Sequence, residues 1–236
     1  MNVLAIDTSN QLLGVALWKE GELKAEFTVN MKRNHSVGLM PAIDHIMKET
    51  DTKPKELDRI AIAKGPGSYT GVRIGLATAK TMAWSLKIPI VGVSSLELLA
   101  SNILSEDCYI SPFFDARRGL VYTGLYQRTS EGLNNIEEDC NILMTDWLKE
   151  LQALSAPIIF LSQDLQQHRQ MIEEYLGEQA FFPEPLFHYP RAGELAFIAT
   201  QKEADNTHAL TPNYIRMVEA EAKWLEKQQQ ERANNE

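Results

Sequence analysis

The sequence predicts an α/β protein built from two copies of one unit, in which three strands are followed by alternating helices and strands (βββαβαβα). The chain opens with an apolar run that ends in an aspartate, at residues 3–7. Strand-like runs follow at residues 13–18 and 23–29, and the same layout returns at residues 109–115 and 120–127. Short helical and apolar runs then alternate in each half, which is typical of strands connected by helices.

In the first half, Thr8, Ser9 and Asn10 form the expected turn between the first two strands, and Gly21 turns the chain again. The third strand alternates apolar and polar residues, so one of its faces should meet water. A helix is expected to begin near His35 and to run to about residue 50, because polar start residues precede an apolar stripe. The other elements expected here are a strand at residues 60–63, a helix at 70–86, a strand at 88–93 and a helix at 95–104.

In the second half, Asp115 precedes Leu125 by the same interval as Asp7 precedes Leu17, which is the trace expected of a diverged duplication. Two such units describe an actin-like, ribonuclease H-like fold with a cleft between its halves. The expected later elements are a helix at residues 147–154, a strand at 157–161 and helices at 166–176 and 192–204. We expect an N-terminal subdomain at residues 1–105, a C-terminal subdomain at 106–216 and a polar C-terminal helix or tail at 217–236.

The glycine-rich stretch at residues 65–75 is the centre of the predicted site. Its glycines permit positive φ or close backbone approach, and a loop of this kind at a helix start favours bound anions. Neither the Walker pattern nor the dinucleotide-binding pattern fits it. Gly71, Gly75, Ala79 and Ala83 recur at every fourth residue, so another backbone must approach this helix closely. That backbone belongs either to the protein's own core or to a partner.

Composition limits the possible functions. With 236 residues and 44% hydrophobic content, the chain can bury a large core. A net charge of −9 argues against a large nucleic-acid surface of its own. No signal-peptide or membrane-spanning pattern is present, so we expect a cytoplasmic protein without a membrane partner. The widely spaced Cys108 and Cys140 indicate neither a disulfide framework nor a zinc site.

Five stretches together resemble the TsaB (YeaZ) family, and the resemblance covers nearly the whole chain. They are residues 4–9 (LAIDTS), His35-Ser36 with residues 39–43 (LMPAI), residues 65–75 (GPGSYTGVRIG), residues 115–119 (DARRG) with Tyr122, and residues 212–216 (PNYIR). The resemblance implies an actin-like fold. It also implies a role in making threonylcarbamoyladenosine next to the anticodon of tRNAs that read codons beginning with adenine.

The resemblance further implies a scaffold without catalytic residues. The catalytic subunit would be a TsaD-like paralogue that transfers the threonylcarbamoyl group, and a TsaE-like ATPase would be a third member. The chain would meet tRNA only through this complex. We also expect the isolated chain to form a homodimer through its two N-terminal helices, because an exposed apolar patch favours being covered. No cofactor is expected on this chain alone, and ATP with magnesium only in the complex.

A metal site is not expected. TsaD-like proteins place two metal-binding histidines four residues apart after a Gly-Val strand end. Here Gly92 and Val93 lead to Ser95 and Leu99 at the matching positions, and leucine cannot bind a metal. The histidines show no regular ligand spacing, which gives a metalloprotease little support; they are His35, His45, His168, His188 and His208.

Two sets of candidate residues follow. A nucleotide-binding set, which we interpret as vestigial because the first hairpin lacks a glycine, consists of Asp7, Thr8, Gly65, Gly67, Ser68 and Asp115. The alternative is an active actin-like ATPase or kinase that uses Asp7, Asp115 and the Gly65–Gly67 loop. A partner interface is expected on the two N-terminal helices at His35, Leu39, Met40, Ile43, Met47, Tyr69, Arg73, Ile74, Ala77, Lys80 and Trp84.

Overall fold

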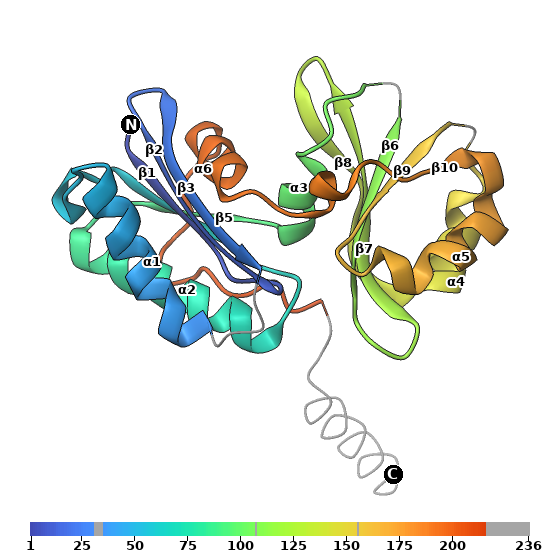
Figure 1. Ribbon diagram of the computed structural model, residues 1–236, viewed down its shortest axis with the longest axis horizontal. Coiled ribbons are helices and arrows are strands. Elements are labelled where there is room, and N and C mark those ends of the chain that lie inside the picture. Colours follow the sequence, from blue (N-terminus) through green and yellow to red (C-terminus); the bar gives the residue numbers. More distant parts are fainter. Residues whose placement is uncertain (31–34, 107, 155, 216–236) are drawn as a thin grey trace, which may run out of the picture.

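A computed structural model describes residues 1–30, 35–106, 108–154 and 156–215 (Figure 1). The first sheet has the strand order β3-β2-β1-β4-β5. Its strands are β1 (Val3–Asp7), β2 (Leu12–Lys19), β3 (Glu22–Asn30), β4 (Arg59–Ala63) and β5 (Ile90–Val93). Strand β1 pairs antiparallel with β2 and parallel with β4. The apolar run of β1 is therefore central and completely buried.

The second sheet repeats this plan with the order β10-β9-β6-β7-β8. Its strands are β6 (Tyr109–Asp115), β7 (Leu120–Thr129), β8 (Gly132–Leu143), β9 (Ile158–Leu161) and β10 (Ala180–Phe181). Strand β6 takes the place of β1, because it pairs antiparallel with β7 and parallel with β9. The predicted duplicated α/β, actin-like fold is confirmed.

Helices cover both faces of each sheet (Figure 1). Helices α1 (His35–Glu49) and α2 (Tyr69–Leu86) pack on one face of the first sheet, and α6 (Ala192–Gln201) packs on the other. On the second sheet, α4 (Met144–Leu151) and α5 (Leu165–Leu176) cover one face and α3 (Ser95–Ala100) covers the other. Short 3-10 helices lie at Pro54–Glu56, Gly177–Gln179 and Pro185–His188. We call the two sheets with their helices the first and second lobes.

Two helices lie on the sheet opposite to their place in the sequence. Helix α3 follows the strands of the first sheet but buries Leu96 and Leu99 against the second. Helix α6 follows the strands of the second sheet but buries Leu195 and Ala199 against the first. The expected division at residue 105 therefore separates the strands of the two sheets, while α3 and α6 connect the lobes across it.

Several element boundaries differ from the sequence-based expectation. Helix α3 ends at Ala100 rather than near residue 104, and α6 ends at Gln201. The sequence did not predict β8 or β10 as strands. The expected tail at residues 217–236 lies outside the described residues. Within the described part of the chain, no helix is long and apolar enough to cross a membrane.

Candidate functional site

The glycine-rich loop packs directly against the turn between β1 and β2. A Cβ atom added at Gly67 would overlap Ser9 O, and one added at Gly71 would overlap Thr8 O. One added at Gly75 would overlap the hydroxyl oxygen of Thr8. The backbone that approaches this helix is therefore the protein's own first hairpin, and the glycines are required for that contact.

The polar groups of the loop bond within the chain. Ser68 N donates to Ser9 O at 2.7 Å, and Thr8 Oγ1 donates to Gly71 O at 2.8 Å. Gly65 N donates to Ser95 Oγ at 3.1 Å. Ser68 also caps α2, because its hydroxyl accepts from Gly71 N at 3.3 Å. The amides of Gly65, Ser68 and Gly71 thus have acceptors within the chain and are not available to a phosphate group.

Asp7 is buried behind this contact and is only 2% exposed. One of its carboxylate oxygens accepts from Ser9 N at 2.8 Å and from Ser9 Oγ at 2.7 Å. Burial raises the pKa of Asp7 above its ordinary value, although the bonds from Ser9 oppose the shift. The carboxylate therefore stabilises the turn and is not directed at a ligand.

A cleft of about 740 Å³ lies between the lobes, as the duplicated layout predicts. Its walls are Ser9, Asn10, Gln11, His35 and residues 67–70 from the first lobe, and residues 114–117, Tyr122, Gln163 and Asp164 from the second. Gln163 Nε2 donates to Asn10 Oδ1 at 2.9 Å and so joins the two walls. Of the predicted nucleotide set, only Gly67, Ser68 and Asp115 line this cleft, whereas Asp7, Thr8 and Gly65 are buried.

Asp115 on the second wall has a histidine partner that sequence analysis did not connect with it. His168 Nε2 lies 3.2 Å from Asp115 Oδ1, and the imidazole packs edge-on against Phe113. Arg117 N donates to the other carboxylate oxygen at 3.2 Å. Among the described residues, no group of three or more histidine, cysteine or acidic side chains is placed to hold a metal ion. The Asp115–His168 pair alone is too small a ligand set.

The positions that match metal-binding histidines in TsaD-like proteins are both core positions. Ser95 is completely buried, and Ser95 N donates to Gly65 O at 2.9 Å. Leu99 is also completely buried, in the cluster between α3 and the second sheet. Ser95 thus bonds to the glycine-rich loop of the first lobe, while Leu99 packs on the second sheet, so α3 connects the two lobes.

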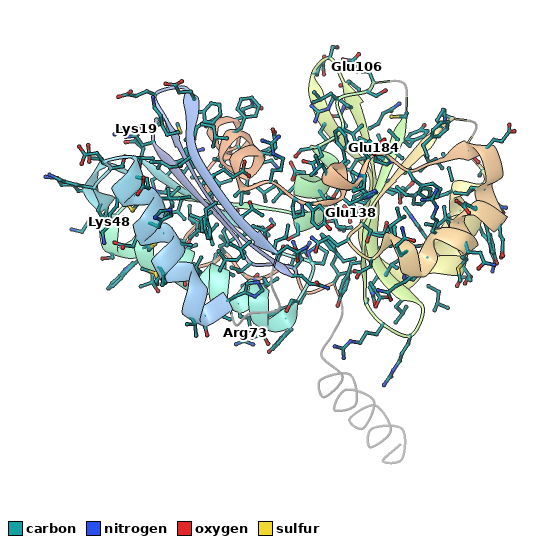
Figure 2. The ribbon with its side chains drawn as sticks, viewed as in Figure 1. Lys19, Lys48, Arg73, Glu106, Glu138 and Glu184 are labelled. Carbon is teal, nitrogen blue, oxygen red and sulfur yellow. The ribbon has the colours of Figure 1, made fainter. Side chains whose placement is uncertain are left out.

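The predicted interface residues divide by exposure. Met40, Tyr69, Arg73, Ala77 and Trp84 are exposed, and Figure 2 shows Arg73 near the N-terminal end of α2. Leu39, Ile43 and Met47 are 1%, 2% and 7% exposed because they belong to the core stripe of α1. Leu39 is therefore too buried to contact a partner, while Ile43 and Met47 line a groove beside α2 with the small part of their surface that is exposed.

Three other predicted interface residues are engaged within the chain. Lys80 Nζ donates to His208 O at 3.1 Å and to Leu210 O at 2.7 Å, so this ammonium fastens the chain after α6 rather than facing solvent. His35 Nε2 lies 3.1 Å from Leu12 O, and Ile74 is half-buried. Val37 was not predicted, yet it is 72% exposed on the turn of α1 that carries Met40.

A second polar cluster lies where β8 carries a bulge. Thr123 pairs with Cys140 and Leu125 with Glu137, so Glu138 and Asp139 lie opposite the single residue Gly124. The bulge turns Asp139 inward, where its carboxylate accepts from Ser94 Oγ and Tyr126 OH. Burial raises the pKa of Asp139, although both hydrogen bonds oppose the shift.

Asp139→Asn is expected to change how stability depends on pH. Above the ordinary pKa of 3.8, the unfolded chain releases the Asp139 proton while the folded chain still holds it. Between the ordinary pKa and the raised pKa of the folded state, the free energy of unfolding of the wild type therefore falls as pH rises. The variant has no proton to release at this position, so its free energy of unfolding lacks this fall. Denaturant unfolding at several pH values should show the variant gaining stability relative to the wild type as pH rises toward neutrality. The exposed neighbour provides the control Glu138→Gln; parallel curves for wild type and Asp139→Asn would contradict the assignment.

Comparisons with known proteins agree with this architecture. The sequence model of the TsaD family, described as tRNA N6-adenosine threonylcarbamoyltransferase, matches residues 23–224, which is most of the chain. The tRNA threonylcarbamoyladenosine biosynthesis protein TsaB of Bacillus subtilis (strain 168) is 51% identical over 228 residues, which cover 97% of this chain and 100% of that protein. The chain belongs to the TsaB family.

TsaB of Escherichia coli (strain K12) is 34% identical over 66% of this chain and 68% of its own length. A Pseudomonas aeruginosa crystal structure, described as a protein with similarity to the peptidase YeaZ, superposes with a TM-score of 0.77 at 24% identity. It covers 91% of this chain and 99% of its own. At that identity the likeness supports the fold alone.

Proposed function

We propose that this chain is the non-catalytic partner of a TsaD-like threonylcarbamoyltransferase and supports tRNA modification by binding that subunit. Its TsaB relatives are named as proteins of tRNA threonylcarbamoyladenosine biosynthesis. Two features of the chain support a role without catalysis. Ser95 and Leu99 are core residues where TsaD-like proteins have metal-binding histidines, and the glycine-rich loop bonds to the chain's own first hairpin.

The observation that carries the proposal is the outer surface of α1 and α2. Val37, Met40 and Trp84 are 72%, 53% and 67% exposed, although the core stripes of both helices are complete without them. Exposed apolar side chains on neighbouring helices are typical of a protein interface. We call Val37, Met40, Ala77 and Trp84 the α1–α2 face.

A groove of about 410 Å³ runs beside this face and adds selectivity to it. Met40, Met47 and Met82 line its apolar part, and such flexible side chains adapt to the shape of a partner. Asp44 and Lys48 lie at its edge, with the ammonium 2.7 Å from the carboxylate. Alternating charges around an apolar centre favour one complementary partner over others. When that partner is missing, two copies could cover the same face as a homodimer.

The binding experiment uses the purified chain and the TsaD-like paralogue from the same organism. Size-exclusion chromatography with light scattering should show a complex larger than either protein, and tRNA should be modified only when both are present with the TsaE-like ATPase. Modification at the full rate by the paralogue and ATPase alone would overturn the proposal. Failure of the two proteins to associate would overturn it as well.

The competing function, an ATPase or kinase, predicts tight nucleotide binding by the isolated chain. We expect calorimetry with ATP and magnesium to detect no stoichiometric binding, because Asp7 is buried and the amides of Gly65, Ser68 and Gly71 already have acceptors within the chain. An Asp7→Ala variant should behave in the same way. Stoichiometric binding with hydrolysis that Asp7→Ala abolishes would establish the competing function instead.

A further inference from the structure

Three planar side chains lie in contact near the N-terminal end of α2. The rings of Tyr69 and Tyr214 are stacked, with centroids 5.6 Å apart and an interplanar angle of 28°. The guanidinium carbon of Arg73 lies 5.0 Å from the centroid of the Tyr69 ring, and Arg73 Nη1 donates to Tyr69 OH. We call these three residues the tyrosine stack.

The core does not require these side chains. Tyr69 is 48% exposed, Tyr214 is 47% exposed, and Arg73 is exposed as well. Neither tyrosine belongs to a hydrophobic cluster of the core. Large aromatic groups left in water at one place are typical of a binding surface rather than of packing.

Tyr214 is held in position by the backbone before it. Asp205 N donates to Ile90 O at 2.8 Å, and Lys80 holds Leu210 O. Leu210 is buried, and Asn213 N donates to Lys64 O at 2.8 Å. The segment that crosses the first lobe is therefore fixed as far as Asn213, which lowers the cost of ordering the Tyr214 ring when a ligand binds.

The stack borders the cleft between the lobes through one of its members, Tyr69. Tyr69 lines that cleft next to Ser68, while Arg117 and Tyr122 line it from the second lobe. Figure 2 shows Arg73 at this end of the first lobe. A ligand at the stack would meet the guanidinium of Arg73. A ligand that also reached past Tyr69 into the cleft would meet Arg117 and Tyr122.

We propose that the tyrosine stack binds one unpaired nucleobase, which stacks on the ring of Tyr214. Tyr69 already contacts both neighbours, so Tyr214 is the end of the row that a further ring can extend. Aromatic rings and guanidinium planes are the groups on which proteins stack unpaired bases, and the contact tolerates any base. Because the net charge is −9, the chain contributes stacking and leaves most phosphate contacts to a partner.

The base could belong to RNA or to a free nucleotide, and only the RNA source rests on the proposed function. The probe is a fluorescent RNA stem-loop with an unpaired adenine-rich loop, titrated with the full chain at low salt. A fully paired RNA duplex and AMP form the other two arms. Loop-dependent binding identifies RNA as the source, whereas equal binding of AMP with the same Tyr214 dependence identifies a nucleotide.

Tyr214→Ala should weaken stem-loop binding by about 5-fold or more, the lower limit for loss of one stacking contact. Tyr214→Phe keeps the ring and should bind within about 2-fold of the wild type, since the face of the ring makes the contact. Phe181→Ala, which removes an exposed ring of β10, is the matched control and should have no effect. Wild-type affinity in Tyr214→Ala, or an equal loss in Phe181→Ala, would overturn the proposal.

The paralogue-binding experiment separates this inference from the proposed function. Tyr214 is not part of the α1–α2 face, so Tyr214→Ala should still form the complex with the TsaD-like paralogue. If the wild type binds RNA through Tyr214 but does not bind the paralogue, the proposed function is wrong and base binding by the tyrosine stack is supported. If the complex forms but Tyr214→Ala binds the stem-loop with wild-type affinity, base binding by the tyrosine stack is wrong and the proposed function is unaffected.

Discussion

Replacing Trp84 with glutamate should weaken binding of the TsaD-like paralogue by about 30-fold or more, which is the loss expected at an aromatic hot spot. The side chain is 67% exposed on α2 and borders a hollow of about 610 Å³ formed with residues 206–208. A carboxylate there would have to lose its hydration in the complex without gaining a partner. Titration of the labelled paralogue with wild type and variant measures the change.

The matched control for Trp84→Glu is Phe181→Glu, because Phe181 is 51% exposed on the second lobe and far in sequence from α1 and α2. It should bind the paralogue like the wild type. Both variants should keep the free energy of unfolding within about 0.5 kcal/mol, since neither side chain contributes to the core. Full-strength binding by Trp84→Glu would place the interface on another surface.

The fold was predictable where one face of an element carries a clear apolar pattern. Strand β6 has the predicted bounds. On α2, the small residues that recur at every fourth position, Gly71, Gly75, Ala79 and Ala83, are all buried. Strand β8 was missed because it is an edge strand whose middle is polar and largely exposed, so its sequence has no continuous apolar side. The exchange of α3 and α6 between lobes was not predictable, because an apolar stripe does not specify which sheet it covers.

The site was less predictable than the fold because it depends on contacts distant in sequence. The pair of Asp115 and His168 joins the end of β6 to α5 across 53 positions, and no local motif indicates it. On α1, Leu39 and Met40 are adjacent in sequence but point to the core and to solvent respectively. The prediction assigned both to the interface, whereas the 3.6-residue period of the helix separates them.

The glycine-rich loop shows how the same residues suit two different purposes. Its glycines first suggest a phosphate cradle, yet Gly67, Gly71 and Gly75 lie against Ser9 and Thr8 of the chain itself. Close backbone approach is the property that both arrangements share. In this protein the contact fixes the start of α2 against the end of β1, and so fixes the helix that carries Trp84.

Gly71→Ala tests this packing, because helix propensity predicts that the free energy of unfolding rises, whereas the contact with Thr8 predicts that it falls. In an open helix, replacing glycine with alanine stabilises by about 1 kcal/mol. At Gly71 the new methyl would overlap the backbone oxygen of Thr8, which cannot move as a side chain can. We therefore expect the free energy of unfolding, measured with denaturant, to fall by about 3 kcal/mol.

Gly38→Ala on α1 is the matched control for this change. Its added methyl would lie 3.2 Å from Leu13 Cδ1, the end of a flexible side chain that can shift by a few tenths of an ångström. The helix preference should then prevail, and this variant should be as stable as the wild type or slightly more so. If Gly71→Ala is as stable as the wild type, the backbone of the first hairpin can shift to accommodate the methyl group, and close packing is not the reason for glycine at the start of α2.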